Sequence, residues 1–187
     1  MTTVERTPMS AEQFYRMPEA KVYELINGQI VEREVINKSS RIGVRIAFRL
    51  DAYCDALRAG WVFGSDQGYQ CFPGDPDRVR RGDASFIQAR RMTQEQYDRE
   101  GFCPVAPDLL VEVISPNDLM DDVEKKRDEW LNAGVKLVWI INPDRKTVWY
   151  HDHTGKEGML RETDTLTAEP VLPGFSLPVA ELFKLPV

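Results

Sequence analysis

The chain has 187 residues, of which 42% are hydrophobic and 29% charged, and its formal net charge is −6 at pH 7. This composition is typical of a globular protein and suffices for a sizeable core. The acidic balance argues against a general nucleic-acid coat protein, although it leaves room for a local basic groove. We expect one domain over residues 1–187, with a flexible end over residues 1–9.

Signals for membrane insertion, secretion and disulfide formation are weak. No apolar run approaches the roughly 18 residues of a membrane span, and the opening residues, MTTVERTPMS, lack the apolar core of a signal peptide. Cys54, Cys71 and Cys103 are widely spaced and odd in number, which argues against a disulfide framework or a zinc knuckle. We therefore expect a cytoplasmic protein without a membrane partner.

The N-terminal segment predicts a short helix and a hairpin. A Ser-x-x-Gln capping box begins a helix over residues 11–17. Asn27-Gly28, the strongest two-residue hairpin signal, separates strands at Val22–Ile26 and Gln29–Val35. Glu24 lies in the first of these strands.

A long helix is predicted from Ser39 or Ser40 to about Ala59, with Gly60 as its end. Apolar residues at helical spacing predict its buried face: Ile42, Ile46, Leu50, Tyr53, Cys54 and Leu57. A second stripe at four-residue spacing, formed by Arg41, Arg45 and Arg49, is interpreted as a solvated helix face.

The next segments predict a strand over Trp61–Phe72, a strand over Arg81–Gln88 that contains Asp83 near its start, and a short helix over Thr93–Glu100. Several arginines flank Asp83: Arg78, Arg80, Arg81, Arg90 and Arg91. They could contact phosphates, or nearby acids could simply balance their charge.

An acid stands inside a strand that is predicted to be buried. Leu109–Ile114 is an apolar run, and a strand that is apolar on both faces belongs inside a covered sheet. Glu112 lies in the middle of this run, where a carboxylate costs several kcal/mol unless a cation or a metal compensates it. Glu112 is therefore the first candidate for chemistry.

The helix predicted over Leu119–Ala133 carries the second candidate. Its apolar stripe consists of Leu119, Val123, Trp130 and Ala133. At about 100° per residue, Lys126 falls in the middle of this stripe, whereas Lys125 points well away. Asp122, one turn earlier, is placed to pair with Lys126. The alternative is a lysine that extends past the apolar surface to water.

The remaining segments predict a strand at Lys136–Asn142, an antiparallel strand at Thr147–His151 and a weak hairpin within residues 155–171. The pattern as a whole predicts an α/β fold with a mixed central sheet and an N-terminal β-hairpin. The long helix is expected on one face of the sheet and the helix over residues 119–133 on the other.

Asp83 and Glu112 would point at one spot if their strands are neighbours. Two carboxylates and a backbone carbonyl, which we expect to be that of Val113, form the oxygen-rich environment that Mg²⁺ prefers. Such a metal lowers the pKa of a bound water and neutralises charge on a phosphodiester. Lys126 would orient that water or stabilise the pentavalent phosphorus, and Glu24 is a candidate third carboxylate.

Short motifs run through nearly the whole chain: YELING at 23–28, GDASF at 82–86, PDLLVEVISP at 107–116, Asp122 with Lys126, AGV at 133–135, VWIINP at 138–143, LPGF at 172–175 and ELF at 181–183. Their identity and order resemble the Uma-two family of restriction-endonuclease-like proteins, within the PD-(D/E)XK nuclease superfamily. The resemblance implies a restriction-endonuclease-like mixed central sheet flanked by helices. It also implies a DNA endonuclease that uses Mg²⁺, or Mn²⁺, to hydrolyse phosphodiester bonds.

The resemblance assigns roles to individual residues. Asp83 matches the metal-binding Asp, and Glu112 matches the acid of the E-x-K motif. The third position of that motif is Ile114 here, and Lys126 matches a helix lysine that takes the place of the strand lysine. Glu24 matches the acid of the early hairpin. The predicted catalytic residues are thus Asp83, Glu112, Lys126 and Glu24, with the metal on Asp83, Glu112 and Val113.

Two positions depart from the family pattern. Gly82 stands where a proline usually precedes the metal-binding Asp, and Ser39 or Ser40 stands where a His often begins the long helix. If that His helps catalysis or binds DNA, this chain would be weaker or inactive.

Other functions remain open at the level of the sequence. A non-catalytic nucleic-acid-binding or assembly protein on a nuclease scaffold is the main alternative, and a metal-dependent hydrolase of a small phosphorylated substrate is a third. A double-strand cut would favour a homodimer, because a single-chain nuclease cuts one strand per site. The sequence does not specify the target sequence, the preference for DNA or RNA, or the biological role.

Overall fold

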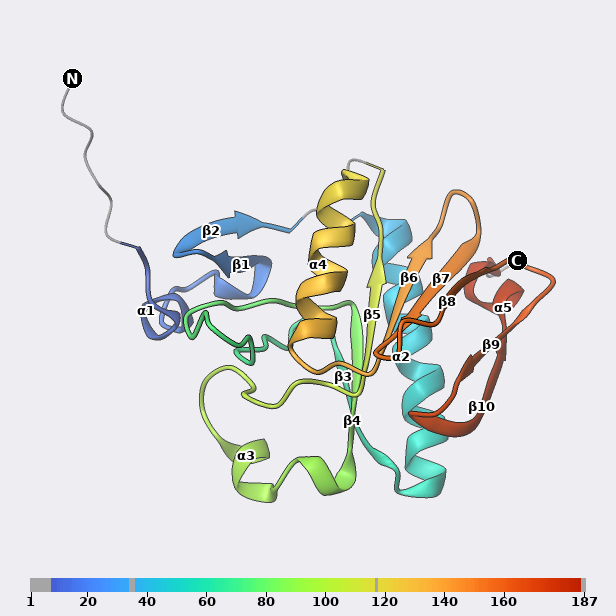
Figure 1. Cartoon of the computed structure of the whole chain (residues 1–187), viewed down its shortest axis with the longest axis horizontal. Coiled ribbons are helices and arrows are strands. Elements are labelled where there is room, and N and C mark those ends of the chain that lie inside the picture. The colour runs from blue at the N-terminus through green and yellow to red at the C-terminus, as the bar shows by residue number, and fades with distance from the viewer. Residues whose placement is uncertain (1–7, 34–35, 117, 186–187) are drawn as a thin grey trace.

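A six-stranded mixed sheet forms the centre of the computed structural model, which describes residues 8–33, 36–116 and 118–185 (Figure 1). Its strands, in spatial order, are β3 (Gly60–Gly64), β4 (Ala84–Gln88), β5 (Leu109–Val113), β6 (Leu137–Asn142), β7 (Thr147–Asp152) and β8 (Glu157–Leu160). β5 and β6 are parallel, and all other neighbours in this sheet are antiparallel. The predicted α/β fold is confirmed. The flexible end expected over residues 1–9 falls mostly outside the described residues.

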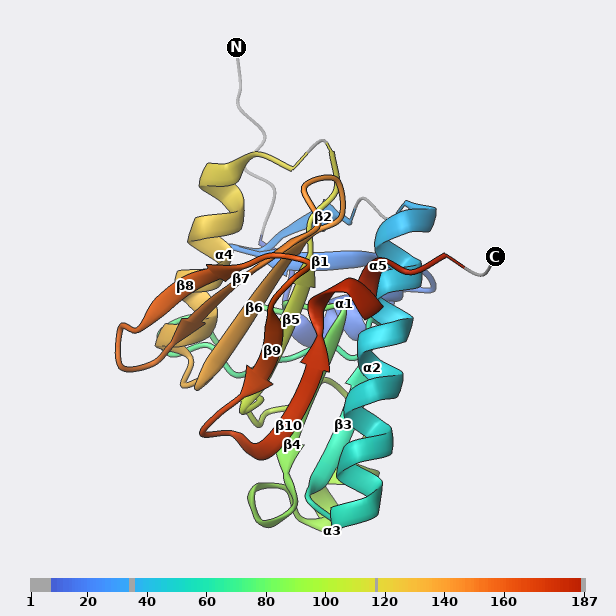
Figure 2. The ribbon, with the colours of Figure 1, turned by 90° about the vertical axis from the view of Figure 1, so that its right-hand side faces the viewer.

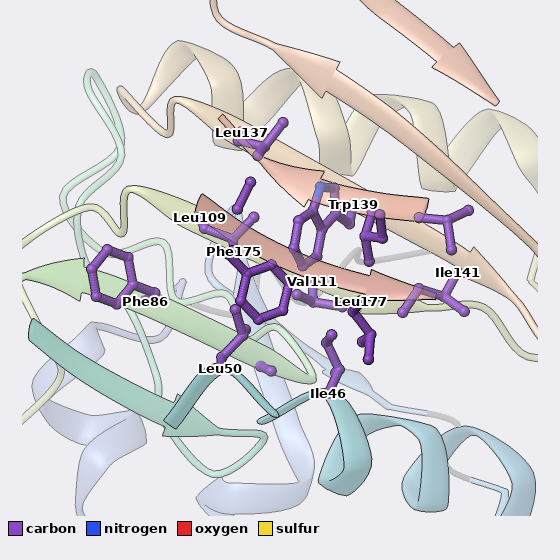
Figure 3. Close-up of a cluster of buried hydrophobic side chains, with 14 of the residues drawn as sticks. Ile46, Leu50, Phe86, Leu109, Val111, Leu137, Trp139, Ile141, Phe175 and Leu177 are labelled. Carbon is purple, nitrogen blue, oxygen red and sulfur yellow. The ribbon is translucent and has the colours of Figure 1, made fainter. Parts of the chain in front are cut away.

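Two helices cover opposite faces of the sheet, as predicted (Figure 2). α2 (Asn37–Leu57) packs on β3, β4 and β5, and Ile46 and Leu50 are fully buried there (Figure 3). α4 (Met120–Asn132) packs on the other face, where Trp130 is fully buried. Because side chains alternate along a strand, the apolar residues of β5 at positions 109, 111 and 113 face α2, and Glu112 faces α4.

The N-terminal hairpin is confirmed, although its second strand ends at Glu32, and residues 34–35 of the predicted strand lie outside the described residues. β1 (Tyr23–Ile26) and β2 (Gln29–Glu32) are joined by Asn27 and Gly28, whose φ angles of 51° and 72° suit a type I′ turn. α1 (Ala11–Tyr15) begins at the expected capping box, and the 3-10 turn η1 (Ala20–Val22) precedes β1. Backbone hydrogen bonds of 3.0 and 2.9 Å join Leu25 and Val79, so the hairpin is tied to the segment that leads into β4.

The interpretation of the arginine stripe on α2 as a solvated face fits Arg41 and Arg49, which are exposed, but is wrong for Arg45. β9 (Thr165–Ala168), β10 (Leu172–Pro178) and α5 (Val179–Phe183) pack on the α2 side of the core. Arg45 donates hydrogen bonds to the carbonyls of Glu181 at 2.7 Å and Leu182 at 3.1 Å, and Arg49 forms an ion pair with Glu181 at 3.4 Å. The stripe therefore anchors the C-terminal helix.

Two predictions about strands are also wrong: the length of one strand and the pairing of another. The strand expected over Trp61–Phe72 ends at Gly64, and only isolated bridges occur in the segment between β3 and β4. Fully buried Arg81 decides the path of this segment, because its guanidinium donates to the carbonyls of Tyr23, Asp66 and Ala20. The hairpin expected within residues 155–171 is absent from the described structure, because β8 pairs with β7 whereas β9 pairs with β10.

Several predicted boundaries shift. α2 is closed by Arg58 at φ 51° and not by Gly60, and Leu57 is 59% exposed instead of buried. Leu119 is likewise exposed, as the N-cap of α4. The 3-10 turn η2 (Ala89–Arg91) and α3 (Gln94–Asp98) follow β4.

All three cysteines are free, and none of the described helices is long and apolar enough to cross a membrane.

Leu50→Ala tests the buried face of α2. The free energy of unfolding should fall by about 3 kcal/mol, because a fully buried leucine leaves a cavity behind. Leu57→Ala, on the same helix but exposed, is the matched control and should change it by less than about 0.5 kcal/mol. Urea unfolding followed by circular dichroism measures both, and equal losses would contradict the assignment.

Candidate active site

The four side chains predicted to form the site line one cavity of about 650 Å³. Glu24 comes from β1, Asp83 directly precedes β4, Glu112 lies in β5 and Lys126 lies in α4. The backbone of Val113 borders the same cavity. Residues that are far apart in the sequence therefore converge where the hairpin, β5 and α4 come together (Figure 1).

Asp83 is held in place by β5. Its N–H donates to the carbonyl of Val111 at 2.8 Å, and its Oδ2 accepts the N–H of Val113 at 2.7 Å. α2 approaches closely, since a Cβ on Gly43 would lie 3.3 Å from the Cβ of Asp83. A Cβ on Gly82 would lie 2.6 Å from Leu110, so this position also packs tightly against β5.

The carbonyl of Val113 points to the side of β5 on which Asp83 lies. The N–H and C=O groups of one strand residue point to the same side. Because the N–H of Val113 donates to Asp83, its carbonyl also faces that side of β5. The expected backbone oxygen therefore points to the side of β5 on which Asp83 lies.

Lys126 bridges two carboxylates. Its Nζ lies 3.0 Å from Oε1 of Glu112 and 3.0 Å from Oε1 of Glu24, and its side chain is only 18% exposed. Lys126 does not form the expected ion pair with Asp122. Asp122 instead contacts Lys125, the solvent-exposed neighbour, at 3.4 Å.

The two partners of Lys126 have opposite pKa shifts. Burial alone would raise the pKa of Glu24, but Lys126, Arg80 and the donated N–H of Arg81 together lower it to about 2. Burial raises the pKa of Glu112 to about 7, because Lys126 only partly offsets burial and Asp83 repels its charge. Trp130 Nε1 donates to Glu112 at 3.2 Å. Glu24 therefore stays ionised, whereas Glu112 changes its charge near neutral pH.

Arg33 is a site residue that sequence reasoning missed. Its guanidinium lies 3.4 Å from Oδ1 of Asp83 and donates to the carbonyl of Ser65 at 3.1 Å. Burial raises the pKa of Asp83, and the positive charge of Arg33 opposes this rise. An arginine at the end of an exposed hairpin strand leaves no periodic signal in the sequence.

The oxygen donors fit Mg²⁺ with two side chains. Among the described residues, no group of three or more His, Cys, Asp or Glu side chains is arranged to hold a metal ion. Asp83, Glu112 and the Val113 carbonyl remain as hard oxygen donors, and Mg²⁺ commonly takes one or two carboxylates and keeps several waters. The two oxygens of Glu24 contact Lys126 and Arg80, so two cations already balance its charge.

The arginines before Asp83 are structural. Arg80 is buried and pairs with Glu24 at 2.9 Å and with Glu129 of α4 at 2.7 Å, and Arg78 also pairs with Glu129 at 2.9 Å. These ion pairs join the hairpin, the segment before β4 and α4. Neither arginine points freely to solvent as a phosphate contact would require.

The serines at the start of α2 differ in role. Ser39 is buried and caps the helix, because its hydroxyl donates to the carbonyl of Ile36 at 3.0 Å and accepts the N–H of Ile36 at 3.2 Å. Ser40 is exposed. Neither position supplies the acid–base group that a histidine would provide.

Comparison with known proteins points to one family. A family model described as "Uma2: Putative restriction endonuclease" matches residues 11–180. A crystal structure from Anabaena variabilis, described as "a putative nuclease belonging to DUF820", is similar with a TM-score of 0.78 and 21% identity. The match covers 94% of this chain and 98% of that chain, which shows that the fold is shared. No curated protein matches.

Lys126→Met tests the central ion pairs. The free energy of unfolding at pH 8 should fall by about 3 kcal/mol, because Glu24 and Glu112 lose the cation that they share, and Glu112 must then stay charged without it or take up a proton. The loss should shrink at pH 5, where Glu112, with its pKa raised to about 7, is already protonated. Lys125→Met is the control and should have little effect at either pH, since Lys125 is exposed. Equal losses for both lysines would show that Lys126 is not buried.

Proposed function

The chain belongs to the Uma2 family of "putative restriction endonucleases", and we propose that it is a Mg²⁺-dependent endonuclease that hydrolyses phosphodiester bonds in DNA. One observation carries the proposal. Lys126, whose side chain is only 18% exposed, contacts Glu112 in the same cavity as Asp83, so the acid, acid and lysine components of the family's motif line one cavity.

The charge distribution supports a metal between Asp83 and Glu112. Both carboxyl groups have raised pKa values because they are buried, so a divalent cation would relieve their desolvation. When bound to Asp83, Glu112 and the Val113 carbonyl, Mg²⁺ would lower the pKa of a coordinated water and neutralise charge on the phosphodiester.

Lys126 and Glu24 act together in the proposed mechanism. Glu24, with its pKa near 2, keeps a negative charge beside Lys126 across the working pH range. Lys126 therefore stays protonated and in place even when Glu112 binds the metal instead. Its ammonium group is then available to donate to the attacking water or to a phosphate oxygen, where negative charge develops in the transition state.

Two further features belong to the proposal. Three free thiols fit the reducing cytoplasm, where disulfides are rare. A double-strand cut would require two copies of the chain, because each copy carries one such site. Sedimentation of the protein with and without DNA would measure this.

A non-catalytic binding protein is the second candidate. The observation that favours it is that a cation already accompanies each candidate metal ligand, Arg33 at Asp83 and Lys126 at Glu112. Such pairs can serve structure alone. A protein of this kind would bind nucleic acid without cutting it.

Cleavage of supercoiled plasmid and single-stranded DNA separates the two candidates. With Mg²⁺ or Mn²⁺ the wild type should nick DNA, and EDTA should stop it. Asp83→Ala and Lys126→Ala should each lower the rate at least about 100-fold, because they remove a metal ligand and a charge-stabilising donor. Lys125→Ala should cut at the wild-type rate. Cleavage that survives both site substitutions, or a folded wild type that neither cuts nor binds metal, would refute the proposal.

A further inference from the structure

A second cavity adjoins the catalytic one, and we propose that it receives an unpaired nucleobase beside the bond that is cut. It measures about 620 Å³ and lies between α2 and β3, and Asp83 lines both cavities. A nucleotide whose phosphate lies near Asp83 would have its base within reach of this second cavity. The inference rests on the proposed function, because it takes Asp83 to mark the position of the reacting phosphate.

An exposed aromatic side chain lines this base cavity. Phe48 is 65% exposed and Val44, one turn earlier on α2, is 68% exposed. Both line the cavity, with Val62 of β3 also in its wall. An exposed phenylalanine at such a place offers a stacking surface to any base, because every base has a π-face.

The polar groups of the base cavity suit a base better than a phosphate. Asp51 and Asp66 line it, together with the exposed residues Ser40 and Ser65. Carboxylates repel a phosphate but accept hydrogen bonds from the amino groups of bases. The cavity therefore offers an aromatic ring on which a base can stack and carboxylate oxygens that can accept hydrogen bonds from it.

The catalytic cavity is poorly suited to a long duplex. Seven carboxylates and four cationic side chains line it: Glu24, Glu32, Asp83, Glu112, Asp118, Asp122 and Glu129, against Arg33, Arg80, Lys125 and Lys126. Each of these four cations already pairs with a carboxylate. Duplex binding depends on cations that neutralise many phosphates, and a paired base cannot enter a pocket without leaving the stack. The substrate class that fits is single-stranded or locally unpaired DNA.

Binding in Ca²⁺ with a fluorescein-labelled oligonucleotide tests the inference apart from cleavage. Fluorescence anisotropy should show at least about tenfold tighter binding of the single strand than of the same sequence as a duplex. Phe48→Leu should weaken single-strand binding about tenfold, because it keeps an apolar side chain but removes the stacking ring. Phe48→Trp should retain binding, and Leu57→Ala, exposed on the same helix outside this cavity, should leave it unchanged.

The outcomes distinguish this inference from the proposed function. Equal binding of single strand and duplex, with no effect of Phe48→Leu, would overturn the base cavity while metal-dependent cleavage still stood. Phe48-dependent binding of single strands without any cleavage would keep the cavity and reject the endonuclease. A change in sedimentation with Phe48→Leu, and none in DNA binding, would show that a second copy of the chain covers the cavity and would overturn the inference.

Discussion

The ammonium group of Lys126, shared between Glu112 and Glu24 at 3.0 Å each, is the interaction on which the site depends. Burying a charge is costly unless partners surround it, so β5, the N-terminal hairpin and α4 must meet at this point. Arg80 extends the same network from Glu24 to Glu129 and so joins the hairpin to α4. The arrangement is asymmetric. Glu24 is held ionised, with a pKa of about 2, whereas Glu112 titrates near pH 7 and is free to exchange its partner.

The sequence predicted the site residues that leave a local signal. Glu112 interrupts an apolar strand and Lys126 interrupts an apolar helical stripe, and both lie where these patterns indicate. Asp83 leaves a weaker signal, because acids near the start of a strand are common, and the resemblance made its assignment specific. The ion pairs of Arg33 and Arg80 could not be predicted, because their partners lie far away in the sequence and a single ion pair has no periodicity.

In the fold too, the elements with a local sequence signal were predicted, whereas those that depend on distant partners were not. The N-terminal hairpin and both covering helices have local signals in turn chemistry and periodicity, and they form where expected. The strand predicted over Trp61–Phe72 fails, because the hydrogen bonds of Arg81 to distant carbonyls decide the path beyond Gly64. The role of Arg45 on α2 was missed for a similar reason, since its partners lie in α5, far away along the chain.

Calorimetric titration of the protein with Mn²⁺ between pH 5.5 and pH 8.5, in buffers of different ionisation enthalpy, tests the central claim most directly. Below pH 7 Glu112 is protonated, so binding should release about one proton, and the affinity should fall about tenfold per pH unit. Above about pH 8 the affinity should level off, and proton release should vanish. Glu112→Gln should abolish this proton release. Metal binding that is independent of pH, or that survives Glu112→Gln unchanged, would contradict the account.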